Sequence, residues 1–258
     1  MYSPQALSEL LQFFTADEQA EMREAAEHYN RLLAALPRVA EAGQQNRSMG
    51  ILALNGASGA GQSYVMARVK KLLDAHNITL PRIYLLATRE PRPDEGYKNP
   101  YIFVIPTAEG FQDRFHPERI YTEDDIYYYY SSRPGAANAI LMEDARRAMQ
   151  EVMYLETVIP TLLHIQQHEI KGIPAWGENL AIVYLAVPSG EEWVYRLLNR
   201  EPERLREADF RAKLLGRIRS SLEDMEVAAQ HEIVTVLNHY GQAEQAAAEI
   251  LRAWGLMV

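Results

Sequence analysis

From residue 49 onwards, short apolar runs alternate with longer stretches in which apolar residues recur at three- and four-residue spacing. The short runs have the length of buried strands, and the longer ones have the period of an amphipathic helix. Strands are predicted for "GILALNG", "RIYLLAT", "YIFVI", "VIPTLLHI", "LAIVYLAV" and "EIVTVLN". Helices are predicted for "SYVMARVKKLLDAH", for "ILMEDARRAMQEVMYLE" and for most of residues 189–230. This alternation predicts an α/β fold with a mainly parallel sheet flanked by helices, in which ligands bind at the carboxyl ends of the strands.

Residues 1–46 have a different pattern, which predicts a helical N-terminal extension. Ser3 and Pro4 fit an N-cap followed by proline in the first turn, and Thr15 with Glu18 fits a capping box. One helical stripe collects the apolar residues Ala20, Met22, Ala25, Leu32, Leu33 and Leu36. Two interpretations follow: a helical hairpin packed on the main domain, or helices that bind a protein partner or mediate self-association.

Composition narrows the class of protein. A chain of 258 residues, 48% of them hydrophobic, can bury a sizeable core. We expect a cytoplasmic protein, because no apolar run has the length of a membrane span and the N-terminus lacks the pattern of a secretory signal. The absence of cysteine excludes disulfides, thiolate metal sites and cysteine nucleophiles. A net charge of −9 argues against binding to nucleic acid or to an anionic membrane.

The stretch "GASGAGQSY" has the frame of a phosphate-binding loop, G-x-x-x-x-G-K-[ST], between a predicted strand and a predicted helix. In such a loop, backbone N–H groups surround phosphate oxygens, and the lysine reaches the β and γ phosphates. Here Gln62 occupies the lysine position, and Ser63 is a candidate magnesium ligand. The candidate loop residues are Gly56, Ser58, Gly59, Gly61, Gln62 and Ser63.

A second candidate site lies in "ATREPRPDEGYKNPYIFV", residues 87–104. Arg89 and Arg92 follow a predicted strand, and Tyr101 begins the next one. Two guanidinium groups and a phenol suit a phosphate monoester, since guanidinium groups bind its oxygens through paired charge-assisted hydrogen bonds. The alternative is a surface loop in which the arginines pair with Asp94 and Glu95.

Several of these segments resemble the guanylate kinase family. "TREPRPDEGYKNPYIFV" resembles its T-R-x-P-R-x-x-E signature and the Y-x-F-V that follows, and "YYYYSSR" is similar to its Y-Y-G-[ST]-S segment. "IVYLAVPSGEEWVYRLLNR" resembles its strand, P-P-S turn and helix. The resemblance covers roughly residues 48–256. It implies a P-loop nucleoside monophosphate kinase-like domain over 47–258, with a lid at about 196–220. Residues 134–159 exceed the family pattern and are expected to lengthen a helix.

The resemblance also implies roles for individual residues. The monophosphate of the acceptor nucleotide would be held by Arg89, Arg92, Tyr101, Tyr130 and Ser132. A lid arginine such as Arg211 could substitute for the missing lysine, although the basic run around it also fits a solvated helical face balanced by glutamates. The family's base-reading glutamate falls at Tyr121, although Glu118 and Glu123 are near enough in the sequence to serve after a small loop shift. In "LLHIQ", His164 and Gln166 fall where two aspartates are expected, so the acidic groups serving magnesium and guanine are predicted to be missing.

Two functions follow from this pattern. The first is a guanylate-kinase-like pseudoenzyme that binds a nucleotide, or a phosphorylated segment of a partner, with little or no phosphoryl transfer. The second is an active guanylate or other nucleoside monophosphate kinase that uses ATP and Mg²⁺ with a variant loop.

Overall fold

The computed structural model describes residues 2–39, 50–92, 95–98, 101–133 and 135–255. The chain forms two compact units. The loop unit comprises Met1–Arg47, Leu54–Thr79 and Ile182–Val258, and the arginine unit comprises Ser48–Ala53 and Leu80–Ala181. Within the described ranges, no helix combines the length and apolar character needed to cross a membrane.

The loop unit begins with two helices, α1 (Pro4–Leu11) and α2 (Ala16–Ala35). Both predicted caps are confirmed. Ser3 Oγ accepts a hydrogen bond from Ala6 N at 3.1 Å, and Thr15 Oγ1 accepts one from Glu18 N at 3.2 Å. Glu18 in turn accepts from Thr15 N at 2.8 Å, which completes the capping box.

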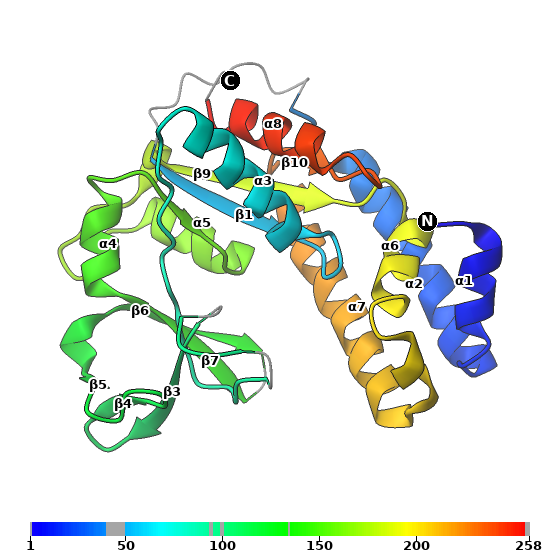
Figure 1. The fold of residues 1–258 in the computed structure, drawn as a ribbon, viewed down its shortest axis with the longest axis horizontal. Coiled ribbons are helices and arrows are strands. Elements are labelled where there is room, and N and C mark those ends of the chain that lie inside the picture. Colours follow the sequence, from blue (N-terminus) through cyan, green and yellow to red (C-terminus); the bar gives the residue numbers. More distant parts are fainter. Residues whose placement is uncertain (1, 40–49, 93–94, 99–100, 134, 256–258) are drawn as a thin grey trace. The chain divides into compact units, whose positions relative to one another are not determined.

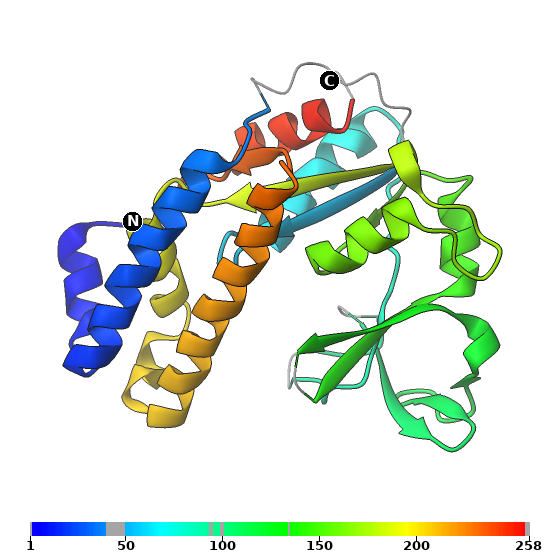
Figure 2. The ribbon, with the colours of Figure 1, turned by 180° about the vertical axis from the view of Figure 1, so that it is seen from behind.

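Helix α2 lies along α6 (Gly190–Leu198) and α7 (Ala208–Gln230), as Figures 1 and 2 show from opposite sides. Most of the predicted apolar stripe is buried there, but Ala20 is exposed, while Tyr29, which the stripe did not include, is fully buried. The ring of Tyr29 stacks on Trp193 at 4.7 Å, and its hydroxyl donates to Val187 O at 3.1 Å and accepts from Val187 N at 2.7 Å. The hairpin is therefore packed on α6 and α7, as one of the two interpretations expected.

A four-stranded sheet has the order β10-β9-β1-β8. Its members are β1 (Ile51–Gly56), β8 (Met153–Leu155), β9 (Leu180–Ala186) and β10 (Thr235–Leu237). Strand β10 pairs with β9, and β8 with β1, in parallel. Strand β1 leads through the glycine loop into α3 (Gln62–Ala75), against which α8 (Ala243–Ala253) packs. The predicted order of strand, loop and helix is confirmed.

A second, six-stranded sheet belongs to the arginine unit and has the order β5-β4-β3-β2-β7-β6. Its members are β2 (Leu86–Ala87), β3 (Ile102–Thr107), β4 (Gly110–Asp113), β5 (Ile120–Tyr121), β6 (Ile126–Arg133) and β7 (Ala136–Leu141). Only the β2–β3 pair is parallel; the others are antiparallel, because β3 to β7 are joined by short connections. The predicted mainly parallel arrangement therefore holds for the four-stranded sheet alone.

Two predicted elements are wrong between residues 134 and 167. The expected strand "VIPTLLHI" is helix α5 (Ile159–Gln167), with Pro160 in its first turn, where a missing N–H has no cost. The expected long helix over 140–156 is only α4 (Met142–Ala148), followed by the buried strand β8. The segment expected to lengthen a helix instead holds β7, α4 and β8.

Three short 3₁₀ turns complete the described elements: η1 (Glu123–Asp125), η2 (Gly177–Asn179) and η3 (Pro202–Arg206). The last of these connects α6 to α7 in the region that the resemblance assigns to the lid. The predicted strand "RIYLLAT" is shorter than expected, because only Leu86 and Ala87 form β2.

Candidate functional site

The glycine loop between β1 and α3 has a backbone that needs its glycines. Gly59 and Gly61 have φ values of 86° and 89°, in the left-handed region that favours glycine. A Cβ on Gly56 would collide with the backbone oxygen of Leu185 and lie 3.2 Å from its carbonyl carbon. The sequence therefore specifies a tight loop that runs directly into a helix.

Side chains from distant segments of the loop unit fix this loop. Ser58 N donates to Ser221 Oγ at 3.1 Å, and Trp193 Nε1 donates to Ser58 O at 2.9 Å. Asn238, which is buried, donates through Nδ2 to Ala60 O at 2.7 Å. Because two loop carbonyls are satisfied by side-chain donors, the loop is held in a defined conformation without a ligand.

The first turn of α3 offers backbone donors. Gly61, the N-cap, makes no side-chain cap, and the first bond within the helix runs from Val65 N to Gly61 O at 3.0 Å. The N–H groups of Gln62, Ser63 and Tyr64 therefore have no partner within the helix. Together with the helix dipole, such groups favour an anion such as a phosphate.

Gln62 closes the loop on itself. Its Nε2 donates to Gly56 O at 2.7 Å, across the full width of the loop. An amide at this position supplies a hydrogen bond and no charge, whereas the lysine of the motif would supply a cation to the β and γ phosphates. One of the two N–H donors of the Gln62 amide is also used by the protein.

A cavity of about 720 Å³ opens beside the loop, and its lining comes entirely from the loop unit. The volume lies within the range usual for small-molecule sites. One part of the lining is the loop and the start of α3: Gly59, Gly61, Gln62 and Ser63. Another part is aromatic: Tyr2, Tyr64, Tyr195 and Tyr240. A cavity that combines backbone donors with aromatic rings suits a ligand with phosphates and a planar base.

Two arginines of α6 and the turn after it also line this cavity. Arg196 is bound by Glu192 at 2.6 Å and donates to Asn238 O at 2.8 Å, so its guanidinium is engaged within the protein. Arg200 is exposed. Arg200 is thus the cation of the cavity that is more open to solvent.

The protein residues at this site could supply only a small part of the ligands of a magnesium ion. Ser63 is exposed in the first turn of α3 and lines the cavity, so its hydroxyl could join an ion held mainly by phosphate oxygens and water. In the described part of the chain, no group of three or more His, Cys, Asp or Glu side chains could hold a metal ion.

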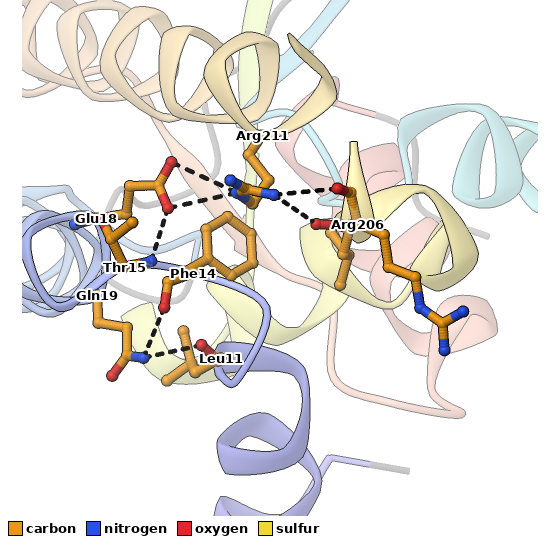
Figure 3. Close-up of polar contacts among 8 residues, drawn as sticks. Leu11, Phe14, Thr15, Glu18, Gln19, Arg206 and Arg211 are labelled. Atoms are coloured by element: carbon orange, nitrogen blue, oxygen red, sulfur yellow. Dashed lines mark hydrogen bonds and ion pairs between the residues drawn. The ribbon is translucent and has the colours of Figure 1, made fainter. Parts of the chain in front are cut away.

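Arg211, the candidate lid arginine, is engaged by the N-terminal helices (Figure 3). Its Nε donates to Glu18 Oε2 at 3.3 Å, its Nη1 donates to Leu205 O at 3.1 Å, and its guanidinium faces the ring of Phe14 at 5.8 Å. The side chains of Arg211 and Glu18 are 15% and 22% exposed. Arg211 is not among the residues that line the cavity.

The other basic residues expected for the lid have different partners. Arg204 pairs with Glu201 at 2.8 Å and with Glu207 at 3.5 Å, as expected for a solvated face balanced by glutamates.

Gln19 adds a second link at the beginning of α2, since its Nε2 donates to the carbonyl oxygens of Leu11 and Phe14 (Figure 3). The turn between α1 and α2 is therefore well fixed.

In the arginine unit, Arg89 forms a two-pronged ion pair with Glu95. The distances are 2.6 Å from Nη1 to Oε2 and 2.7 Å from Nη2 to Oε1, and both side chains are largely buried. The hydrogen bonds from Arg89 hold the pKa of Glu95 below its usual value. The expected pairing with Glu95 is thus present, while Asp94 lies outside the described residues. Arg89 Nη1 also donates to Glu90 O at 2.9 Å, so the guanidinium has a fixed orientation.

Arg92 and Tyr101 flank this ion pair. Arg92 donates its backbone N–H to Glu95 at 2.8 Å, and its side chain is 49% exposed. The Arg89 guanidinium lies 5.2 Å from the centre of the Tyr101 ring. Arg89 and Arg92 therefore share the Glu95 carboxylate, and the Tyr101 ring lies beside the Arg89 guanidinium.

Tyr130, on β6, is buried and has two polar partners. Its hydroxyl shares a short hydrogen bond with Thr157 Oγ1 and accepts one from Asn138 Nδ2 at 3.4 Å. Burial raises the pKa of Tyr130 to about 12. The backbone of Ser132 belongs to the same strand, whereas its side chain lies outside what the structure describes.

The prediction that His164 and Gln166 replace two strand-end aspartates is wrong, because both lie on helix α5. His164 stacks on Tyr128 at 4.9 Å, and Gln166 donates to Leu180 O at 3.2 Å. The residues that follow strand β8 are Glu156 and Thr157. A carboxylate is therefore present after this strand, and it pairs with Arg82 at 2.9 Å.

Tyr121, at the expected position of the base-reading glutamate, lies on β5 and is partly buried. Burial raises its pKa. Sequence analysis missed Asn138, Glu156 and Thr157. Pro160 was the signal that could have found Glu156 and Thr157. A proline in this pattern marks the start of a helix, so the strand must end before it, and these two residues follow that strand.

The chain was compared with protein families, with curated proteins and with solved structures, and only solved structures gave matches. No protein-family model matches the chain, and no curated protein matches it. Among solved structures, the crystal structure of guanylate kinase from Anaplasma phagocytophilum is similar, with a TM-score of 0.46 and 13% sequence identity. The alignment covers 83% of this chain and 91% of that chain. A similarity at this level does not assign the chain to a family.

Proposed function

We propose that the protein is a guanylate-kinase-like pseudoenzyme, which binds a nucleotide at the cavity of the loop unit and transfers little or no phosphate. The observation that carries the proposal is the hydrogen bond from Gln62 Nε2 to Gly56 O at 2.7 Å. The residue at the position of the charged lysine is neutral, and one of its two N–H donors holds the loop.

Binding is supported by features that do not need the lysine. The backbone N–H groups at the start of α3, which have no partner within the helix, favour phosphate oxygens. The cavity beside them has the size and the aromatic lining of a nucleotide site. The loop is held by Ser221, Trp193 and Asn238, so little ordering is required when a ligand enters.

Phosphoryl transfer requires more of the site than nucleotide binding does. Phosphoryl transfer depends on positioning and on neutralising the charge that spreads over the moving group. Loss of one preorganised donor from such a site costs about 10²–10³ in rate. Arg211, which would have to compensate, is bound by Glu18 and by the carbonyl oxygen of Leu205.

The arginine unit supports binding of a second phosphorylated group. Arg89 is oriented by Glu95, and the side chain of Arg92 is half exposed beside it. The ligand would be a nucleoside monophosphate or a phosphorylated segment of a partner protein. The proposal also includes self-association or partner binding through α1 and α2.

An active nucleoside monophosphate kinase is the second candidate, and two observations favour it. Glu156 supplies a carboxylate after β8, and Arg200 supplies an exposed cation at the cavity. In this case ATP would bind at the loop with Mg²⁺, Ser63 would contribute one ligand to the ion, and Arg200 would assist in place of the lysine.

Calorimetric titration with ATP–Mg²⁺, GMP, AMP and dTMP, with ADP followed in the same samples, separates the two candidates. The proposal expects ATP to bind without formation of ADP. Formation of ADP that depends on one monophosphate would refute it and identify the substrate. Absence of binding by every nucleotide would refute both candidates and leave a phosphorylated protein segment to be tested.

Two variants sharpen the test. Gln62→Lys should leave turnover near background if the protein is a pseudoenzyme, because a restored lysine supplies only one of the groups that position the transferred phosphate and neutralise its charge. In an active kinase the same change should raise turnover by about 10²–10³. Arg92→Ala should weaken binding of a monophosphate and leave ATP binding unchanged. Arg92 is preferred to Arg89 for this purpose, because its exposed side chain contributes less to the fold.

A further inference from the structure

The residues just before α1 have a fixed place in the loop unit. Ser3 caps the helix through its side chain, Leu7 N donates to Ser3 O at 3.1 Å, and Pro4 begins the first turn. Helix α1 packs against α6. The position of Tyr2 is therefore determined by the beginning of a capped helix.

Tyr2 lines the same cavity as the phosphate loop. Its ring lies 5.6 Å from the ring of Tyr195 on α6, at an angle of 59°. Tyr2 is partly exposed, whereas Tyr195 is 8% exposed. Burial, with a smaller contribution from Glu191 and Glu192, raises the pKa of the Tyr2 phenol. The ring is thus supported on one side by α6 and remains accessible from the cavity.

The aromatic residues of the cavity are not equivalent. The Tyr64 ring has the guanidinium of Arg68 at 3.9 Å from its centre, and its hydroxyl accepts a hydrogen bond from Arg68 at 2.7 Å. Tyr195 is almost entirely buried. Tyr64 and Tyr240 are 57% and 59% exposed, more than Tyr2. The Arg68 guanidinium lies over the Tyr64 ring, however, whereas the partly exposed Tyr2 ring is held against Tyr195.

We infer that the N-terminal segment is part of the nucleotide site, with Tyr2 as a binding residue for the planar base. The inference rests on the proposed nucleotide binding and extends it. The backbone donors of the loop hold the phosphates, and the Tyr2 ring, supported by Tyr195, provides the face on which the base packs. The extension thereby gives the site a preference for ligands that carry a base over ligands made of phosphate alone.

The test compares two probes, ATP–Mg²⁺ and inorganic tripolyphosphate with Mg²⁺, on the full chain by calorimetry. Tyr2→Ala should weaken ATP binding by about 10-fold or more, the effect expected for loss of one stacking ring, and leave tripolyphosphate binding unchanged. Tyr2→Phe keeps the ring and should stay within about twofold of the wild type for both probes. Tyr129→Ala removes an exposed tyrosine of the arginine unit and is the matched control.

The outcomes are distinct. Selective loss of ATP binding in Tyr2→Ala, with rescue in Tyr2→Phe, supports the inference. Equal weakening of both probes would overturn it, because Tyr2 would then act through the fold of the loop unit, and unchanged ATP binding would overturn it directly. If the wild type binds neither probe, the proposed nucleotide binding itself is refuted, and the inference fails with it. If it binds tripolyphosphate as tightly as ATP, the loop binds phosphate but the role of Tyr2 is refuted.

Discussion

Gly190, the first residue of α6, permits the close approach of helix α2. A Cβ at this position would lie 2.6 Å from the carbonyl carbon of Ala26 and 2.7 Å from its Cα, and it would collide with the carbonyl oxygen. Carbon atoms in contact are normally about 3.5–4.0 Å apart. The Ala26 atoms that the Cβ would meet all belong to the backbone, so no side-chain rotation can relieve the contact. A Gly190→Ala change therefore requires α2 to move away from α6 by about 1 Å.

The cost of Gly190→Ala can be worked out from the contacts that this movement disturbs. Overpacking costs about 1–3 kcal/mol. Gly190 N also donates to Asn30 Oδ1 at 2.7 Å, and leaving such a group without a partner costs about 1–3 kcal/mol more. We expect the free energy of unfolding to fall by about 2–6 kcal/mol in total. Far-UV circular dichroism in a urea titration measures this change.

Gly216→Ala is the matched control, since Gly216 lies within α7 and a Cβ there would meet no atom within 4 Å. Alanine should stabilise this helix by about 0.5–1 kcal/mol. Hydrogen exchange at the amides of Ala16–Ala35 should become faster in Gly190→Ala and not in the control. If the Gly190→Ala protein unfolds at the same urea concentration as the wild type, with unchanged exchange in α2, the packing described for this helix is refuted.

Three further changes test other contacts. Tyr29→Phe leaves the buried N–H and carbonyl of Val187 without their partner, so the urea titration should show a loss of about 2–3 kcal/mol; a loss below 0.5 kcal/mol would contradict this. The pKa of Glu95 is lowered by Arg89, so its stabilising effect is complete above the pKa of the unfolded state, about 4.3, and is lost as the pH falls through the folded value. The stability difference between wild type and Glu95→Gln should therefore shrink between about pH 6 and pH 3, and a constant difference would refute the pairing. Asn238→Ala removes a donor to the glycine loop and, if ATP binds there as proposed, should weaken ATP binding about fivefold by calorimetry; unchanged affinity would mean that the loop is held without it.

The sequence predicted the elements whose signals are local. The capping box at Thr15 and the glycine loop before Gln62 depend on residues within a few positions of one another, and both are present. The segment around Pro160 was misjudged, because a short apolar run fits a strand or a buried helix equally well. Strand β8 has only three residues, so its apolar pattern merged with that of the helix before it.

The contacts that define the candidate sites are mostly long-range. Glu18 and Arg211 are 193 positions apart, and Asn238 and Ala60 are 178 apart. No periodicity or spacing rule joins such residues, because their meeting depends on how α2, α7 and β10 pack. The pairing of Arg89 with Glu95 was foreseen as an alternative because the two are only six positions apart.

The Glu18 carboxylate both caps helix α2 and binds Arg211, since it accepts from Thr15 N at 2.8 Å and from Arg211 Nε at 3.3 Å. The start of α2 and the position of Arg211 are therefore thermodynamically linked. The coupling free energy is the same in both directions. If the first turn of α2 holds Arg211 in place with a given free energy, an anion that draws Arg211 away from Glu18 changes the stability of that turn by the same amount. The extent of fraying at residues 15–19 would then change when an anion binds to Arg211.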